Sequence, residues 1–89
     1  MVEREVEIVN QLGLHARAAA KLVHQAARFR ARSMLIRDGE EVDAKSILGV
    51  LLLAAAQGTR LTVRCVGDDE GEALSALVGL IEDRFQEGQ

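Results

Sequence analysis

The order in which two hydrophobic periods alternate along this chain of 89 residues limits its fold more than any other feature. Apolar residues recur at every second position where a half-buried strand is expected, and at every third or fourth position where a helix is expected. The dipeptide Asp38-Gly39, between two short apolar segments, predicts a tight hairpin. The expected elements span, in order, residues 2–8 (strand), 16–29 (helix), 33–37 and 40–44 (strands), 45–58 (helix), 60–66 (strand) and 67–85 (helix).

This βαββαβα order predicts an α+β fold. A four-stranded antiparallel sheet with three helices on one face, an open-faced sandwich, is the compact arrangement of such elements. The length is that of one domain, so we expect residues 1–89 to fold as a single unit. Apolar residues make up 48% of the chain and only two residues are aromatic, so the core should be aliphatic.

The ends and inner faces of the helices can also be predicted. Ser46 is a good N-cap for the second helix, and Gly58 is a good stop at its C-terminus. The third helix starts with a run of acidic residues, which suits the positive end of a helix dipole. Its expected inward face consists of Leu74, Leu77, Ile81 and Phe85.

Composition excludes several classes of function. The chain has no Trp or Tyr and a net charge of −3, which argues against binding nucleic acid. It also lacks an apolar segment long enough for a membrane span. One cysteine, Cys65, has no intramolecular partner and no metal-site spacing, so we expect a buried thiol in a reducing compartment, the cytoplasm.

No metal or cofactor is expected. The acidic group that opens the third helix resembles a chelating cluster, but the preference of helix starts for negative charge explains it more simply. Its members are Asp68, Asp69, Glu70 and Glu72.

The candidate functional residue is His15, which stands where a helix N-cap is expected. The first amides of a helix are unpaired and carry partial positive charge, so a phosphate gains hydrogen bonds there. We therefore expect the backbone amides of Ala16 and Arg17 to bind a phosphoryl group held on His15, and the Arg17 guanidinium to reach its oxygens. The same positive surroundings favour a neutral imidazole, the form able to attack phosphorus. Gly13 permits the tight turn before the site.

By itself this pattern is weak, because a histidine beside a helix start is usually an exposed polar residue without a chemical role. The remainder of the chain supports a chemical role for His15. The stretches GLHARAAAKLV (13–23) and DAKSILGVLLLAAAQGTRLTVRCVGDDEGEAL (43–74) resemble the histidine phosphocarrier (HPr) family of the bacterial phosphoenolpyruvate:sugar phosphotransferase system. The resemblance covers essentially the whole chain, and the βαββαβα order agrees with that fold.

The resemblance implies specific roles. His15 would be phosphorylated on Nδ1 by enzyme I, and would pass the phosphoryl group to enzyme IIA proteins for sugar uptake, with Arg17 as the phosphoryl partner. Ser46 matches the serine that a dedicated HPr kinase/phosphorylase modifies in many relatives. The chain departs from the family's His-x-Arg-Pro pattern at Ala18, where alanine, a strong helix former, should still allow the helix to start.

Two surfaces are candidates for partner docking. The second helix is apolar around most of its circumference, so some of its side chains should face outward, and an exposed aliphatic cluster usually marks an interface. The alternative is that the loop after Phe29 or the third helix covers it. A basic stripe on the first helix is usually only solvated, but beside His15 it would steer acidic partners. The docking candidates are Ile47, Leu48 and Leu51 on the second helix and Lys21 and His24 in the stripe Arg17, Lys21, His24 and Arg28.

The sequence thus favours a stoichiometric phosphocarrier without a substrate pocket of its own over an independent enzyme, and the resemblance implies that it is a monomer. Two alternatives stay open: a relative dedicated to a nitrogen or regulatory branch, and a small α/β domain that senses a metabolite with His15 as an incidental cap. Labelling by enzyme I separates the carrier from the sensor.

Overall fold

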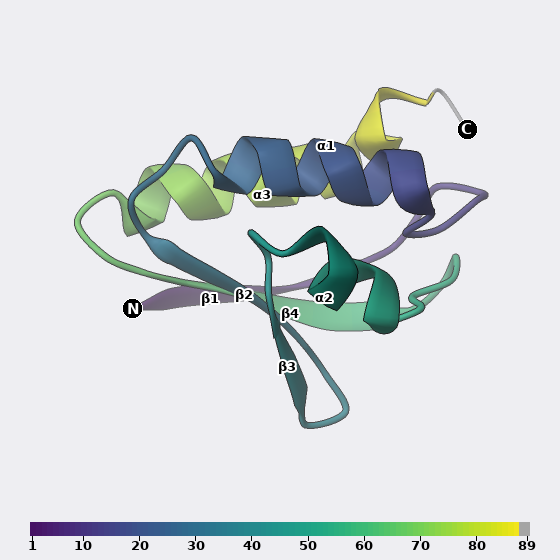
Figure 1. Ribbon diagram of the computed structural model, residues 1–89, viewed down its shortest axis with the longest axis horizontal. Coiled ribbons are helices and arrows are strands. Elements are labelled where there is room, and N and C mark those ends of the chain that lie inside the picture. The colour runs from purple at the N-terminus through teal and green to yellow at the C-terminus, as the bar shows by residue number, and fades with distance from the viewer. Residues whose placement is uncertain (88–89) are drawn as a thin grey trace.

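The computed structural model describes residues 1–87, which form one sheet and one layer of helices (Figure 1). Its elements are β1 (Val2–Glu7), α1 (Ala16–Ala26), β2 (Arg32–Arg37), β3 (Glu40–Asp43), α2 (Ile47–Leu52), β4 (Arg60–Val66), α3 (Glu70–Glu82) and a 3₁₀ turn, η1 (Arg84–Gln86). The strands lie in the order β1-β4-β2-β3, and every neighbouring pair is antiparallel. All three helices cover the same face of this sheet. The predicted open-faced sandwich is confirmed.

The core lies between the sheet and the helices, and its buried side chains are aliphatic apart from Phe85 and Cys65. Leu61, Val63 and Cys65 on β4 are all buried, as their alternation predicted. The buried face of α1 consists largely of alanine, and such small side chains let the helix lie close to its neighbours. The inward face of α3 differs from the prediction, because Leu74 is only half-buried. Its buried residues are Ala73, Leu77, Val78 and Ile81.

The Asp38-Gly39 hairpin is confirmed in detail. Asp38 and Gly39 have φ values of +50° and +82°, as a type I′ turn requires, and the flanking Arg37 and Glu40 pair across β2 and β3. Both turn residues therefore adopt the left-handed conformation that this dipeptide favours.

The prediction for the second helix was wrong at its C-terminal end. Helix α2 stops at Leu52 rather than at Gly58, because Ala54 adopts a left-handed conformation with φ +50° and turns the chain. This turn buries Ala55 and directs its carbonyl to the amide of Leu14 (2.9 Å). A tertiary contact thus overrides the helix propensity of the alanine run. Gly58 instead has φ +90° in the turn before β4.

The other two helices are shorter than expected. Helix α1 ends at Ala26, and hydrogen-bonded turns carry the chain on to Phe29. Helix α3 begins at Glu70 and ends at Glu82, and the chain reaches Phe85 through η1. In the described part of the chain, no helix is long and apolar enough to cross a membrane.

Candidate functional site

A glycine turn between β1 and α1 positions the candidate histidine. Gly13 has φ +66°, and a Cβ at this position would lie 2.6 Å from the carbonyl oxygen of Ala55. The next residue, Leu14, donates its amide to the same oxygen at 2.9 Å. Only glycine fits this turn, which seats the start of α1 against the segment that follows α2.

His15 is the N-cap of α1, as predicted. Its backbone is extended (φ −74°, ψ 176°), its carbonyl accepts the first helical bond from Ala19, and its ring Nδ1 accepts from the amide of Arg17 at 3.3 Å. The side chain is 26% exposed, so the ring is accessible to solvent. Its bond from the Arg17 amide shows that Nδ1 is directed toward the helix end. The lone pair of Nδ1 therefore faces the electropositive amides.

The other ring nitrogen has a partner that the sequence did not suggest. Nε2 of His15 contacts the Glu87 carboxylate, 72 residues further along the chain, and Glu87 also accepts from the side-chain amide of Asn10 at 3.1 Å. Partial burial raises the pKa of Glu87, but the hydrogen bonds from His15 and Asn10 outweigh it, so its pKa lies below the ordinary value. Both ring contacts require the same tautomer, with the proton on Nε2 and the lone pair on Nδ1.

A strained turn delivers Glu87 to this position. We call residues 84–87 the C-terminal strap. Arg84, Phe85 and Gln86 all have positive φ values, 56°, 53° and 64°. Each such non-glycine residue costs about 1 kcal/mol, so the conformation persists only if other contacts impose it. Phe85 is fully buried, and Lys21 donates to its carbonyl at 2.6 Å. These two contacts hold the strap against α1.

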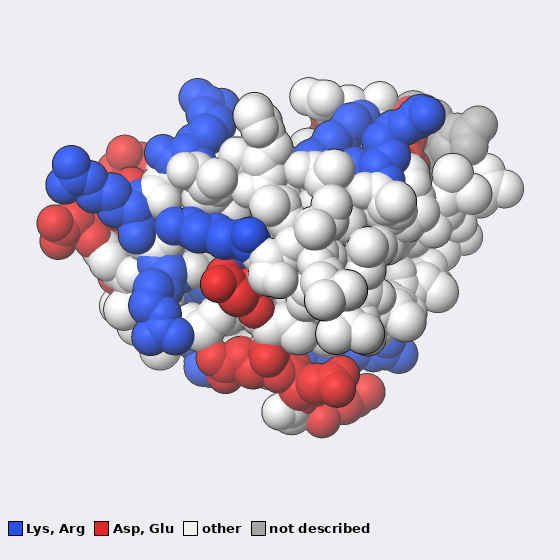
Figure 2. Space-filling model, viewed as in Figure 1, with Lys and Arg blue, Asp and Glu red and all other residues white. Residues whose placement is uncertain are grey.

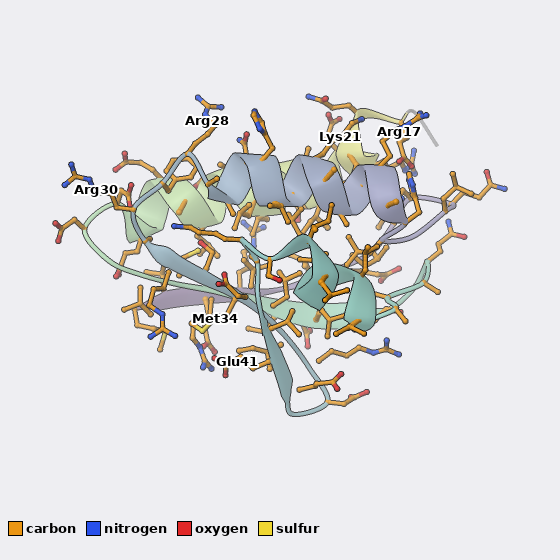
Figure 3. All side chains as sticks on the ribbon, viewed as in Figure 1. Arg17, Lys21, Arg28, Arg30, Met34 and Glu41 are labelled. Carbon is orange, nitrogen blue, oxygen red and sulfur yellow. The ribbon has the colours of Figure 1, made fainter. Side chains whose placement is uncertain are left out.

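The residues around His15 form an open hollow with mixed charge. Besides His15 it is lined by Leu12, Arg17, Lys21, Gln86 and Glu87. The side chain of Leu12 is 65% exposed at its edge, an apolar feature that the sequence analysis missed. Arg17 and Lys21 lie along the outer side of α1 (Figure 3), where they bring positive charge to the hollow.

The predicted basic stripe of Arg17, Lys21, His24 and Arg28 is only partly exposed. Arg17 and His24 are exposed on α1, and Arg28 is exposed in the turn that follows the helix. Lys21 is half-buried, since its amine is bonded to the strap. Lys21 is therefore less available to a partner than the sequence suggested.

The second docking candidate, helix α2, presents leucine and isoleucine to solvent. Ser46 caps the helix by accepting from the amide of Gly49 at 3.1 Å, as predicted. Val50 and Leu53 are buried in the core, whereas none of the described residues 1–87 covers the opposite side of the helix. Figure 2 shows an uncharged surface over α2, with basic side chains of α1 above it and acidic ones of the β2–β3 hairpin below. The exposed aliphatic residues are Ile47, Leu48, Leu51 and Leu52.

The remaining candidate residues have structural roles. Burial raises the pKa of Cys65, whose Sγ lies 3.5 Å from the Ser33 hydroxyl. The Asp69 carboxylate accepts from the amides of Arg30 and Ala31, and so joins the start of α3 to the loop before β2. Among the described residues, no three His, Cys, Asp or Glu side chains come together as a metal would need.

The fold and the site together define a class of protein. A histidine at the electropositive end of a helix, with a guanidinium beside it and an apolar docking surface on the next helix, is suited to carrying a phosphoryl group between proteins.

Comparison with known proteins identifies the family. Residues 2–83 match the model of the PTS-HPr family, described as the PTS HPr component phosphorylation site. The chain is 53% identical to the phosphocarrier protein HPr of Xylella fastidiosa over 87 residues (98% of each chain), and 49% identical to that of Cupriavidus necator over 89 residues (100% of each). Its fold superimposes on the crystal structure of HPr-C-His from Thermoanaerobacter tengcongensis with a TM-score of 0.95, at 45% identity over 98% of each chain. The chain belongs to the PTS-HPr family and is a phosphocarrier of the phosphotransferase system.

Proposed function

We propose that His15 is the residue that carries the phosphoryl group, and that Nδ1 is the atom that binds it. The observation that carries this proposal is the direction of the ring: its unprotonated nitrogen faces the amides at the start of α1. The Nδ1 lone pair forms a bond to phosphorus while the bond between phosphorus and the donor imidazole breaks, in line, and its electrons return to the donor ring. Onward transfer is the same step with the roles exchanged.

Arg17 and the helix amides are the proposed phosphoryl-binding groups. The Arg17 amide now donates to Nδ1 over 3.3 Å, a long hydrogen bond that a phosphoryl oxygen can replace. The amide of Ala16 lies in the same first turn, where helical amides have no intrahelical acceptor. The exposed Arg17 guanidinium completes the set, and its planar fork suits two phosphoryl oxygens.

Enzyme I is the proposed donor and enzyme IIA proteins are the proposed acceptors, all in the cytoplasm. Both would dock on one surface, because both must reach the same Nδ1. The exposed side chains of Ile47, Leu48 and Leu51 supply its apolar centre. His24 and, to a smaller extent, Lys21 supply a basic edge that speeds encounter with acidic partners.

Ser46 is a proposed regulatory site, modified by an HPr kinase/phosphorylase. Its hydroxyl caps α2 directly before Ile47 and Leu48. A phosphate on this hydroxyl would place about two negative charges beside the apolar docking surface, and the cost of desolvating them would weaken docking.

Labelling experiments test the role of His15. The protein is incubated with enzyme I and phosphoenolpyruvate labelled on its phosphate. We expect one acid-labile, base-stable phosphoryl group per chain, absent in His15→Ala. His24→Ala is the matched control, because it removes the other histidine and should reach the same final stoichiometry. An unlabelled wild-type chain would overturn the proposed role of His15.

A charge placed on α2 tests the docking surface. Leu48→Asp should raise the KM of enzyme I for this protein about tenfold or more, because an apolar contact that is buried in the complex is replaced by a charge. Ser75→Asp introduces the same charge on the exposed side of α3 and should change this KM less than about twofold. Equal KM values for the two variants would place docking elsewhere.

A further inference from the structure

The C-terminal strap places a carboxylate on the side of His15 that faces away from the helix amides. Nδ1 faces α1, and Nε2 faces Glu87, so the two ring nitrogens have separate partners. A group bound to Nδ1 therefore does not need the position that Glu87 occupies.

We propose that Glu87 is a positioning residue for phosphoryl transfer, which holds the proton of His15 on Nε2 and stabilises the positive charge that the ring gains as Nδ1 bonds to phosphorus. This inference rests on the proposed role of His15. In the step, the Nδ1 lone pair enters the bond to phosphorus, the donor ring recovers its own electron pair, and the proton stays on Nε2, where it donates to Glu87. A hydrogen bond from a ring that becomes positive to a carboxylate strengthens as the charge develops.

The carboxylate is held in place before any partner binds. One oxygen of Glu87 contacts Nε2 and the other accepts from Asn10 at 3.1 Å. Asn10 is fully buried and also donates to the carbonyl of Gly13 at 2.8 Å, so the same amide ties the strap to the turn that seats His15. The Glu87 side chain is only 13% exposed, which limits its freedom to leave.

The rest of the strap explains how this contact persists. Three successive left-handed residues would relax without an anchor, but fully buried Phe85 and its bond from Lys21 keep the turn closed. The charged residues that line the hollow with the ring are Arg17 and Lys21 from α1 and Glu87 from the strap. Glu87 is the one anion lining this hollow among the described residues, so its removal changes the sign of the charge next to Nε2.

Kinetics with enzyme I separate positioning from docking. We compare wild type, Glu87→Ala, Glu87→Gln and Glu87→Asp, with Glu72→Gln as the matched control, since Glu72 is an exposed carboxylate on α3. We expect Glu87→Ala to lower kcat for phosphorylation about tenfold with KM changed less than about twofold. Glu87→Gln should recover part of kcat, because the amide oxygen still accepts from Nε2–H, and Glu87→Asp should recover part by restoring charge. Glu72→Gln should match the wild type.

The pH dependence of phosphohistidine hydrolysis supplies a readout that a merely structural role would not move. Ring protonation promotes this hydrolysis, and the proton on Nε2 donates to the Glu87 carboxylate. The rate of hydrolysis measured at each acidic pH should therefore fall in both Glu87→Ala and Glu87→Gln, which lack the charge. Circular dichroism checks that each variant is folded.

The outcomes distinguish the two proposals. An unlabelled wild type overturns the role of His15, and with it this inference. Normal labelling of His15 with unchanged kcat and an unchanged hydrolysis profile in Glu87→Ala overturns the role of Glu87 alone. Faster phosphorylation of Glu87→Ala also overturns it, because the carboxylate would then obstruct the site.

Discussion

Replacing Gly13 by alanine tests how the structure seats the functional histidine. The new Cβ would lie 2.6 Å from the carbonyl oxygen of Ala55 and 3.0 Å from the Cα of Ala56, both of which are backbone atoms. The left-handed conformation at φ +66° costs alanine about 1 kcal/mol relative to glycine. Displacement of the Ala55 carbonyl weakens its hydrogen bond from the Leu14 amide, which costs about 1 kcal/mol. The steric clash that remains costs about 1 kcal/mol more. We therefore expect a loss of about 3 kcal/mol.

Urea unfolding followed by circular dichroism measures this loss. For a domain of this size it is a large share of a total that is about 5–10 kcal/mol. Gly39→Ala is the matched control: its φ is +82° and a Cβ there meets nothing within 4 Å, so it carries the conformational penalty of about 1 kcal/mol alone. The difference between the two losses in free energy of unfolding measures the cost of the contact between the new Cβ and the backbone of Ala55 and Ala56. Equal losses, within about 0.5 kcal/mol, would refute the argument that packing against Ala55 demands glycine.

Three further predictions concern other parts of the molecule. Hydrogen bonds from the Arg30 and Ala31 amides lower the pKa of Asp69, although desolvation opposes them. The contribution of Asp69 to stability is therefore present above about pH 4 and is lost as the pH falls through the folded pKa. The free energy of unfolding should consequently fall less steeply with decreasing pH in Asp69→Asn than in the wild type. Cys65 is buried with a raised pKa, so its thiol should react with a disulfide reagent at pH 8 about 100-fold more slowly than in denaturant. Ala18→Pro should change the rate of phosphorylation less than about fivefold, because a first-turn amide has no intrahelical acceptor to lose, and a many-fold gain would show that rigidity at this position limits transfer.

Local patterns were enough to predict most of the architecture. Alternation along β4, the Asp38-Gly39 turn and the cap at Ser46 involve only neighbours in the chain, and each is confirmed. Because the seven-element order allows few compact arrangements, the antiparallel sheet with its helical layer followed as well.

The errors occurred where distant residues decide the backbone. Helix α2 stops at Leu52 because Ala55 is needed beside Leu14, more than 40 residues away along the chain, and an alanine run contains no sign of that need. The burial of Lys21 has the same kind of cause: its amine is bonded to the carbonyl of Phe85, 64 residues away, and the spacing of basic residues along the first helix gives no sign of this contact.

The sequence by itself determined the element order, the histidine at a helix start and the arginine beside it, because periodicity and capping depend on spacing of a few residues. Tertiary structure alone decided which ring nitrogen faces the helix amides and which group meets the other one. Glu87 lies 72 residues from His15, and only the folding of the C-terminal strap onto α1 brings its carboxylate to the ring. Contacts between segments so far apart depend on packing, which local residue patterns do not encode.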